Sequence, residues 1–126
     1  MCLGYVLFMD GYQDIEERLK GMDPAEFIVL DSVMYDTSHY LIVKNRIPHT
    51  RVDFESFGQV NWSRVKLLFI GNCGVEEKDE VPEQVIEGIK NYMNGGGKVI
   101  SHNSGVVVTS ACFPDKICFN FVFQLI

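Results

Sequence analysis

Lys66-Leu-Leu-Phe-Ile70, followed directly by Gly71-Asn-Cys-Gly74, is the stretch of sequence that decides the fold. Its apolar run is continuous rather than alternating, which is typical of a strand buried on both faces of a parallel sheet. The glycine-flanked segment after it predicts a tight turn at the carboxyl end of that strand. Apolar residues then recur at helical spacing through residues 82–94, and Pro82 suits the first turn of a helix. The stretch therefore predicts a strand, a turn and a helix.

Further buried strands flank this unit on both sides. Lys98-Val-Ile-Ser101 follows the helix after a glycine run that stops it, and Phe27-Ile-Val-Leu30 and Tyr5-Val-Leu-Phe-Met9 precede the unit. Residues 14–22 between those two early strands carry a capping pattern and helical spacing. Alternating strands and helices predict an α/β protein, a three-layer flavodoxin-like fold with a mostly parallel sheet and helices on both faces.

Three segments are less regular. Thr50, Val52 and Phe54 alternate with charged residues, which predicts a half-buried strand, and a further strand is expected at 40–43. Residues 106–112 leave two interpretations open, because the three valines favour a strand whereas the position after a strand favours a short crossover helix. The last strand is predicted at 117–123.

Length and composition limit the class of protein. The 126 residues predict one domain, 1–126, and 47% hydrophobic residues exclude a disordered chain. A net charge of −6 argues against nucleic acid and anionic membranes as partners. The four cysteines form no C-x-x-C pair, so the sequence predicts neither a zinc site nor a redox site. Without a secretory signal, we expect reduced cysteines in a cytoplasmic protein.

The C-terminal residues 121–126 are apolar to the last position. Such an end is typical either of a fragment of a longer protein or of a strand that pairs into a sheet, and both interpretations stay open. We therefore expect a protein partner or self-association through this apolar strand.

Ligands on parallel α/β sheets bind at the carboxyl ends of the strands. The polar and glycine residues expected there make up a set of candidate ligand-binding positions: Asp10, Asp31, Asn72, Gly74 and Ser104. The acidic run 76–80 could bind a hard cation, but such a run is more typical of a solvated loop before a helix, so no metal site is expected. No cofactor is expected either.

Two segments carry a resemblance to a known family. Leu67-Leu-Phe-Ile-Gly-Asn-Cys-Gly74 and, after the helix, Gly95-Gly-Gly-Lys-Val-Ile-Ser-His-Asn-Ser-Gly105 resemble the central part of class I glutamine amidotransferase-like domains. The resemblance spans residues 60–118 and is greatest to the non-amidotransferase branch, the trehalose-utilisation-type domains and the gliding and intraflagellar-transport-type domains. It implies the flavodoxin-like fold and a strand that enters a tight elbow.

The elbow of this chain is degenerate. In amidotransferases the elbow carries a nucleophilic cysteine, and a catalytic histidine follows it. Asn103 occupies the matching nucleophile position here, and no histidine follows His102. An amide cannot serve as the nucleophile, so glutamine hydrolysis is not expected. The sequence therefore predicts a non-catalytic binding or protein-interaction module.

The alternative is a small cysteine-dependent hydrolase or transferase. Cys73 follows a strand in a turn whose backbone N–H groups could lower its pKa, and His102 and Asn103 follow another strand. A cysteine, a histidine and an asparagine are chemically sufficient for acyl transfer if they converge. A third class, a flavodoxin-like domain that binds a nucleotide or a flavin, is also open. The sequence identifies no substrate.

Overall fold

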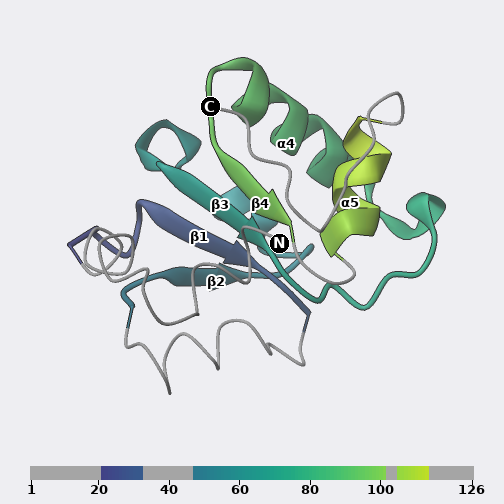
Figure 1. The fold of residues 1–126 in the computed structure, drawn as a ribbon, viewed down its shortest axis with the longest axis horizontal. Coiled ribbons are helices and arrows are strands. Elements are labelled where there is room, and N and C mark those ends of the chain that lie inside the picture. The colour runs from purple at the N-terminus through teal and green to yellow at the C-terminus, as the bar shows by residue number, and fades with distance from the viewer. Residues whose placement is uncertain (1–20, 33–46, 102–104, 114–126) are drawn as a thin grey trace, which may run out of the picture.

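The computed structural model describes residues 21–32, 47–101 and 105–113. Within these residues the core is a sheet of four parallel strands in the order β2-β1-β3-β4 (Figure 1). The strands are β1 (Phe27–Leu30), β2 (Thr50–Val52), β3 (Leu67–Ile70) and β4 (Val99–Ser101). The predicted α/β class with a parallel sheet is confirmed.

The two central strands are apolar at every position because both of their faces are covered. All four residues of β1 and all four of β3 are buried, and Phe27 to Leu30 pair in register with Leu67 to Ile70. On the outer side of β1, Val29 pairs with Arg51 of β2. In β2, the outer strand on this side of the described sheet, the three residues change from exposed to buried along the strand.

Both described helices lie on one face of the sheet. The helix α4 (Glu83–Asn94) buries Val85, Ile89, Tyr92 and Met93, and α5 (Gly105–Cys112) buries Val108 and Cys112 in the same hydrophobic cluster. Three short 3-10 helices complete the described elements: η2 (Phe57–Gln59), η3 (Trp62–Arg64) and η4 (Lys78–Glu80). Figure 1 shows α4 and α5 on the β4 side of the sheet.

The second face of the sheet carries a separate apolar cluster. It contains Phe27, Val29, Phe69 and Ile100, together with Ile47. These side chains are at most 5% exposed. The helix that the sequence predicts at 14–22 lies outside the described residues, as do the strands predicted at 5–9, 40–43 and 117–123.

The ambiguous segment after β4 is a helix. A methyl group added at Gly105 would lie 2.1 Å from the Ile70 carbonyl oxygen, so α5 begins against the backbone of β3 and only glycine fits there. The Thr109 hydroxyl donates to the Gly105 carbonyl at 3.1 Å and also bonds the Ser101 hydroxyl of β4. Packing on the sheet thus outweighs the strand propensity of the three valines.

The strand predicted at residues 50–54 is confirmed only in its first part. Thr50 and Val52 belong to a strand as expected, but Phe54 follows it in a turn because Asp53 and Ser56 bond each other and close the chain there. Pro82 directly precedes α4 and Gly95 ends it.

In the described part of the chain, no helix has the length and apolar character needed to cross a bilayer.

Candidate functional site

The strand order places a switch point between β1 and β3. The chain runs from β1 to β2 on one side and then returns to β3 on the other side of β1. In parallel α/β sheets, ligands bind outside the carboxyl ends of the strands where the order reverses in this way. Asp31 and Ser32 follow β1 at this point, and Asn72 and Cys73 follow β3.

Backbone hydrogen bonds hold these two strand ends together. The Gly71 N–H donates to the Leu30 carbonyl at 2.8 Å, and the Ser32 N–H donates to the Asn72 carbonyl at 2.6 Å. The pairing of β1 and β3 thus continues past the last strand residues. Four predicted candidates, Asp31, Asn72, Cys73 and Gly74, are therefore brought to one place.

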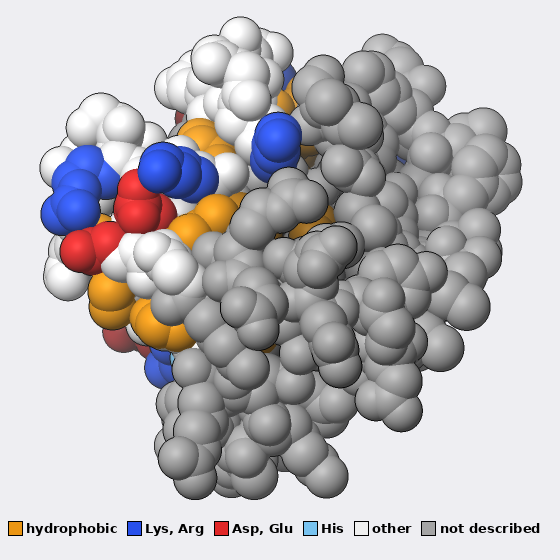
Figure 2. Space-filling view, turned by 60° about the vertical axis from the view of Figure 1, so that its left-hand side comes forward, with side chains coloured by type: hydrophobic (Ala, Val, Ile, Leu, Met, Phe, Trp, Pro, Cys, Tyr) orange, Lys and Arg blue, Asp and Glu red, His pale blue; other side chains and the backbone are white. Residues whose placement is uncertain are grey.

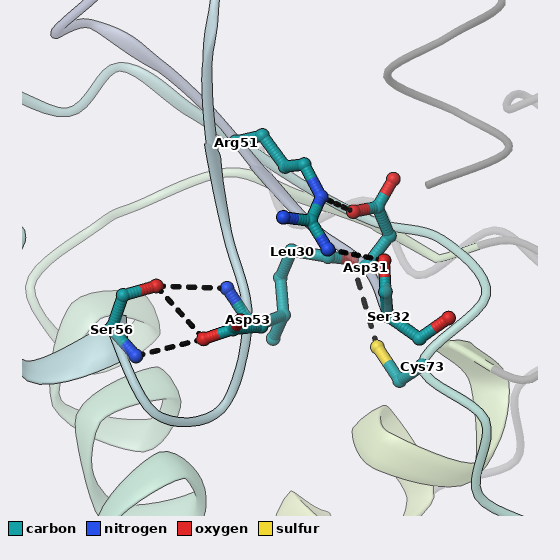
Figure 3. A network of polar contacts seen from close by, with 7 residues as sticks. All are labelled: Leu30, Asp31, Ser32, Arg51, Asp53, Ser56 and Cys73. Atoms are coloured by element: carbon teal, nitrogen blue, oxygen red, sulfur yellow. Dashed lines mark hydrogen bonds and ion pairs between the residues drawn. The ribbon is translucent and has the colours of Figure 1, made fainter. Parts of the chain in front are cut away.

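Asp31 and Arg51 form the charged centre of the site. The Asp31 side chain is fully buried, and the Arg51 Nε–H donates to its Oδ1 at 2.7 Å (Figure 3). A second guanidinium N–H, on Nη2, donates to the Ser32 carbonyl. The Arg51 side chain remains 27% exposed, so this pair joins a buried carboxylate to the surface. Such a charge is tolerated in the interior only when it is paired and hydrogen-bonded.

Arg51 was not among the residues that the sequence singled out. The alternating segment that contains it predicted only a half-buried strand with charged residues between the apolar ones. The register explains its role, because Arg51 pairs with Val29, two residues before Asp31 on the neighbouring strand. A long basic side chain on β2 can reach forward to a carboxylate at the end of β1. An acidic residue at a strand end and a basic residue on the adjacent strand would have been the signal.

Cys73 lies in the turn after β3, close enough to Asp31 to be affected by its charge. The residue is 8% exposed, and the thiol donates to the Leu30 carbonyl at 3.6 Å. Burial raises the pKa of the Cys73 thiol to about 12, and the negative charge of Asp31 adds to the increase. The sequence suggested a thiol with a lowered pKa, whereas these surroundings favour the protonated form.

Asn72 and Gly74 shape the turn after β3. The Gly74 N–H donates to the Asn72 Oδ1 at 3.1 Å, and Gly74 has a φ of +70°, which favours glycine. A Cβ at Gly74 would lie 3.7 Å from the Ser32 Cβ, in ordinary contact. The turn is therefore fixed by backbone conformation and by one amide side chain.

A second polar turn lies at the carboxyl end of β2. The Ser56 N–H donates to the Asp53 Oδ1 at 2.9 Å, and the Asp53 N–H donates to the Ser56 Oγ at 3.0 Å (Figure 3). The bond that the carboxylate accepts from the Ser56 N–H, and after it the bond from the Ser56 hydroxyl, lower the pKa of Asp53. The Asp53 carboxylate is thus committed to holding the turn beside the site.

Four candidates lie outside the described residues: Asp10, His102, Asn103 and Ser104. The convergence of Cys73 with His102 and Asn103 stays a prediction. Among the described residues, no group of three or more His, Cys, Asp and Glu side chains is placed to hold a metal ion.

The amino ends of the strands have a different character. Lys66 pairs with Glu26 at 2.8 Å, and Arg64 with Asp23 at 3.6 Å. Figure 2 shows basic and acidic side chains next to one another on the described part of this side. The two basic side chains are 65% and 52% exposed, and exposed pairs contribute little to stability. The buried charge of the described sheet lies at its carboxyl edge.

Comparison with known proteins gives no relative: no protein-family model, no curated protein and no solved structure matches this chain. Inference about function therefore depends on the geometry of the carboxyl edge.

Proposed function

We propose that this protein is a non-catalytic binding module whose ligand contacts the carboxyl edge of the sheet between β1 and β3. We also propose that the chain is similar to class I glutamine amidotransferase-like domains and has a degenerate elbow. The passage from β4 through residues 102–104 into α5 supports that resemblance at the level of chain order. A cytoplasmic location, and a protein partner or self-association through the apolar residues 121–126, belong to the same proposal.

One observation carries the non-catalytic interpretation: the thiol at the switch point is buried and hard to ionise. With a pKa of about 12, on the order of one Cys73 thiol in 100,000 is a thiolate at pH 7. A nucleophilic cysteine requires a substantial thiolate fraction and access to substrate. The 8% exposed Cys73 provides neither in this conformation.

The charged pair supports a binding role at the same edge. Arg51 is fixed at two points, by the Asp31 carboxylate and the Ser32 carbonyl. A guanidinium held in this way is pre-organised, so little side-chain entropy is lost when its exposed part contacts a ligand. The arrangement fits a small polar ligand that accepts hydrogen bonds.

The test of the non-catalytic proposal is the reactivity of individual cysteines. We expect alkylation of Cys73 by iodoacetamide at pH 7, followed by mass spectrometry, to be about 1,000-fold slower than alkylation of a free thiol of ordinary pKa. Cys112, which is 2% exposed, is the buried reference within the same chain. His102→Ala should leave the Cys73 rate unchanged.

The opposite result would establish the alternative. A Cys73 that reacts far faster than Cys2, Cys112 and Cys118, and loses this reactivity in His102→Ala, would support the hydrolase or transferase and refute the non-catalytic proposal. For the ligand, a thermal-shift screen with nucleotides and flavins tests the switch point directly. Stabilisation that disappears in Arg51→Met, measured relative to the melting temperature of that variant, would place the ligand at this edge.

A further inference from the structure

An open hollow lies between η4 and α5, and none of the switch-point residues Asp31, Ser32, Asn72 and Cys73 is among the described residues that line it. It has a volume of about 570 Å³. The described residues that line it are Glu76, Glu77, Lys78, Asp79, Val106, Val107 and Ser110. Figure 1 shows the teal segment with η4 beside α5, and the two elements are in contact. We call this hollow the η4–α5 groove.

One wall of the groove is acidic and held in place. The acidic residues Glu76, Glu77 and Asp79 are exposed. Lys78 is the one basic residue among the described lining residues, so the wall carries a net charge of −2. The Glu80 carboxylate accepts hydrogen bonds from the Glu76 N–H at 3.1 Å and the Glu77 N–H at 2.9 Å. This bonding fixes the backbone that carries the three lining carboxylates.

The other wall is apolar. Val106 and Val107 of α5 are only partly buried, although the same helix buries Val108 completely. Val107 packs against the described core, whereas Val106 belongs to neither core cluster. The groove therefore combines an aliphatic surface with a fixed row of negative charges.

The geometry points to a polypeptide partner rather than an ion or a small molecule. The lining carboxylates form no metal-binding group among the described residues. A small molecule would need an enclosed pocket that covers most of its surface, and this hollow is open. A peptide needs only a groove with apolar contacts and complementary charge.

We propose that the η4–α5 groove docks a segment of a partner protein in which lysine or arginine side chains alternate with aliphatic ones. The aliphatic side chains contact Val106 and Val107, and the basic ones lie over Glu76, Glu77 and Asp79. This inference rests on the proposed binding function and adds a second surface to it. Acidic side chains in the partner would be repelled by the same wall.

The test uses a short fluorescein-labelled peptide in which lysine alternates with leucine, and measures its binding by fluorescence anisotropy. The double variant Glu76→Gln with Asp79→Asn should weaken binding by roughly 2- to 25-fold, about 1.5- to 5-fold per exposed charge pair. Val106→Ser should weaken it by about 3-fold or more through lost apolar contact. Added salt should weaken binding to the wild-type protein and have less effect on the double variant.

Matched controls identify the surface and the chemistry. Glu87→Gln removes one exposed carboxylate from α4 outside the groove, and it should leave the affinity unchanged. A peptide with glutamate in place of lysine and one with serine in place of leucine should both bind less well. Thermal unfolding of each variant confirms that it is folded at the assay temperature.

Three results would overturn the proposal: no binding of the lysine–leucine peptide, equal binding to the double variant, or equal binding of the glutamate peptide. Self-association of the protein that is abolished in the double variant would assign the groove to a second copy instead. The failure of this proposal is distinct from failure of the proposed function, because rapid alkylation of Cys73 would refute the non-catalytic interpretation and leave the peptide result standing.

Discussion

Replacing Arg51 by methionine removes the guanidinium from the buried Asp31 carboxylate while keeping an unbranched side chain of similar length. Loss of one partner of a fully buried ion pair costs about 3–5 kcal/mol, because the remaining charge stays in the interior without its partner. Here the Asp31 side chain is 0% exposed but that of Arg51 is 27% exposed. Water can therefore replace part of the interaction, and we expect a loss of roughly 2–4 kcal/mol in the free energy of unfolding.

The assay is urea unfolding followed by circular dichroism. With an ordinary slope for a small domain, the loss corresponds to a decrease of about 1–2 M in the urea midpoint. Arg64→Met is the matched control, since the Arg64–Asp23 pair is about half exposed on both sides and spans 3.6 Å. Its loss should cost about 0–1 kcal/mol.

A double-mutant cycle tests the physical reason. Asp31→Asn combined with Arg51→Met should cost less than the sum of the two single changes, with a coupling of about 1 kcal/mol or more. The reasoning would be refuted by a loss in Arg51→Met no larger than that in Arg64→Met, or by a coupling energy near zero.

Three further predictions concern neighbouring features. Gly105→Ala should lower the urea midpoint more than Gly58→Ala, because its Cβ would meet the Ile70 carbonyl oxygen at 2.1 Å whereas nothing lies within 4 Å at Gly58. Thr109→Val should destabilise the fold by about 1–3 kcal/mol in the same assay, since it leaves the buried Ser101 hydroxyl without its bond to α5. The pKa of Asp53 is lowered by its bonds to Ser56, so it should titrate below its ordinary value of 3.8 in an NMR titration. Its contribution to stability should be present above that value and be lost as the pH falls through the folded-state pKa, and Ser56→Ala should raise this pKa.

The sheet was the most predictable part of the molecule. A central parallel strand must be apolar on both faces, so β1 and β3 appear in the sequence as continuous apolar runs that end at polar or glycine residues. The helix α4 was equally clear because one face buries Val85, Ile89 and Met93 at helical spacing. In each case a local pattern in the sequence corresponds to a single burial environment.

The helix α5 could not be predicted from local pattern because its stability depends on distant contacts. Its valines favour a strand, and its position is fixed by a glycine against β3 and by a threonine bonded to β4. The role of Arg51 was hidden for the same reason. It depends on the register between two strands that lie about twenty residues apart in sequence, as the Asp31–Arg51 separation shows.

The same edge of the sheet can now be interpreted as two different electrostatic environments. At the switch point, the Asp31 carboxylate is buried and bonded to Arg51, and it also makes the nearby Cys73 thiol harder to ionise. A base or a cation placed beside Cys73 would have the opposite effect and produce a reactive thiolate. The negative charge therefore favours a site that orients a polar ligand over a site in which a thiolate attacks the ligand.

In the η4–α5 groove the carboxylates are exposed, and there their effect is to select a basic partner and to exclude an acidic one. Burial rather than residue type separates the two roles, because acidic side chains serve in both places.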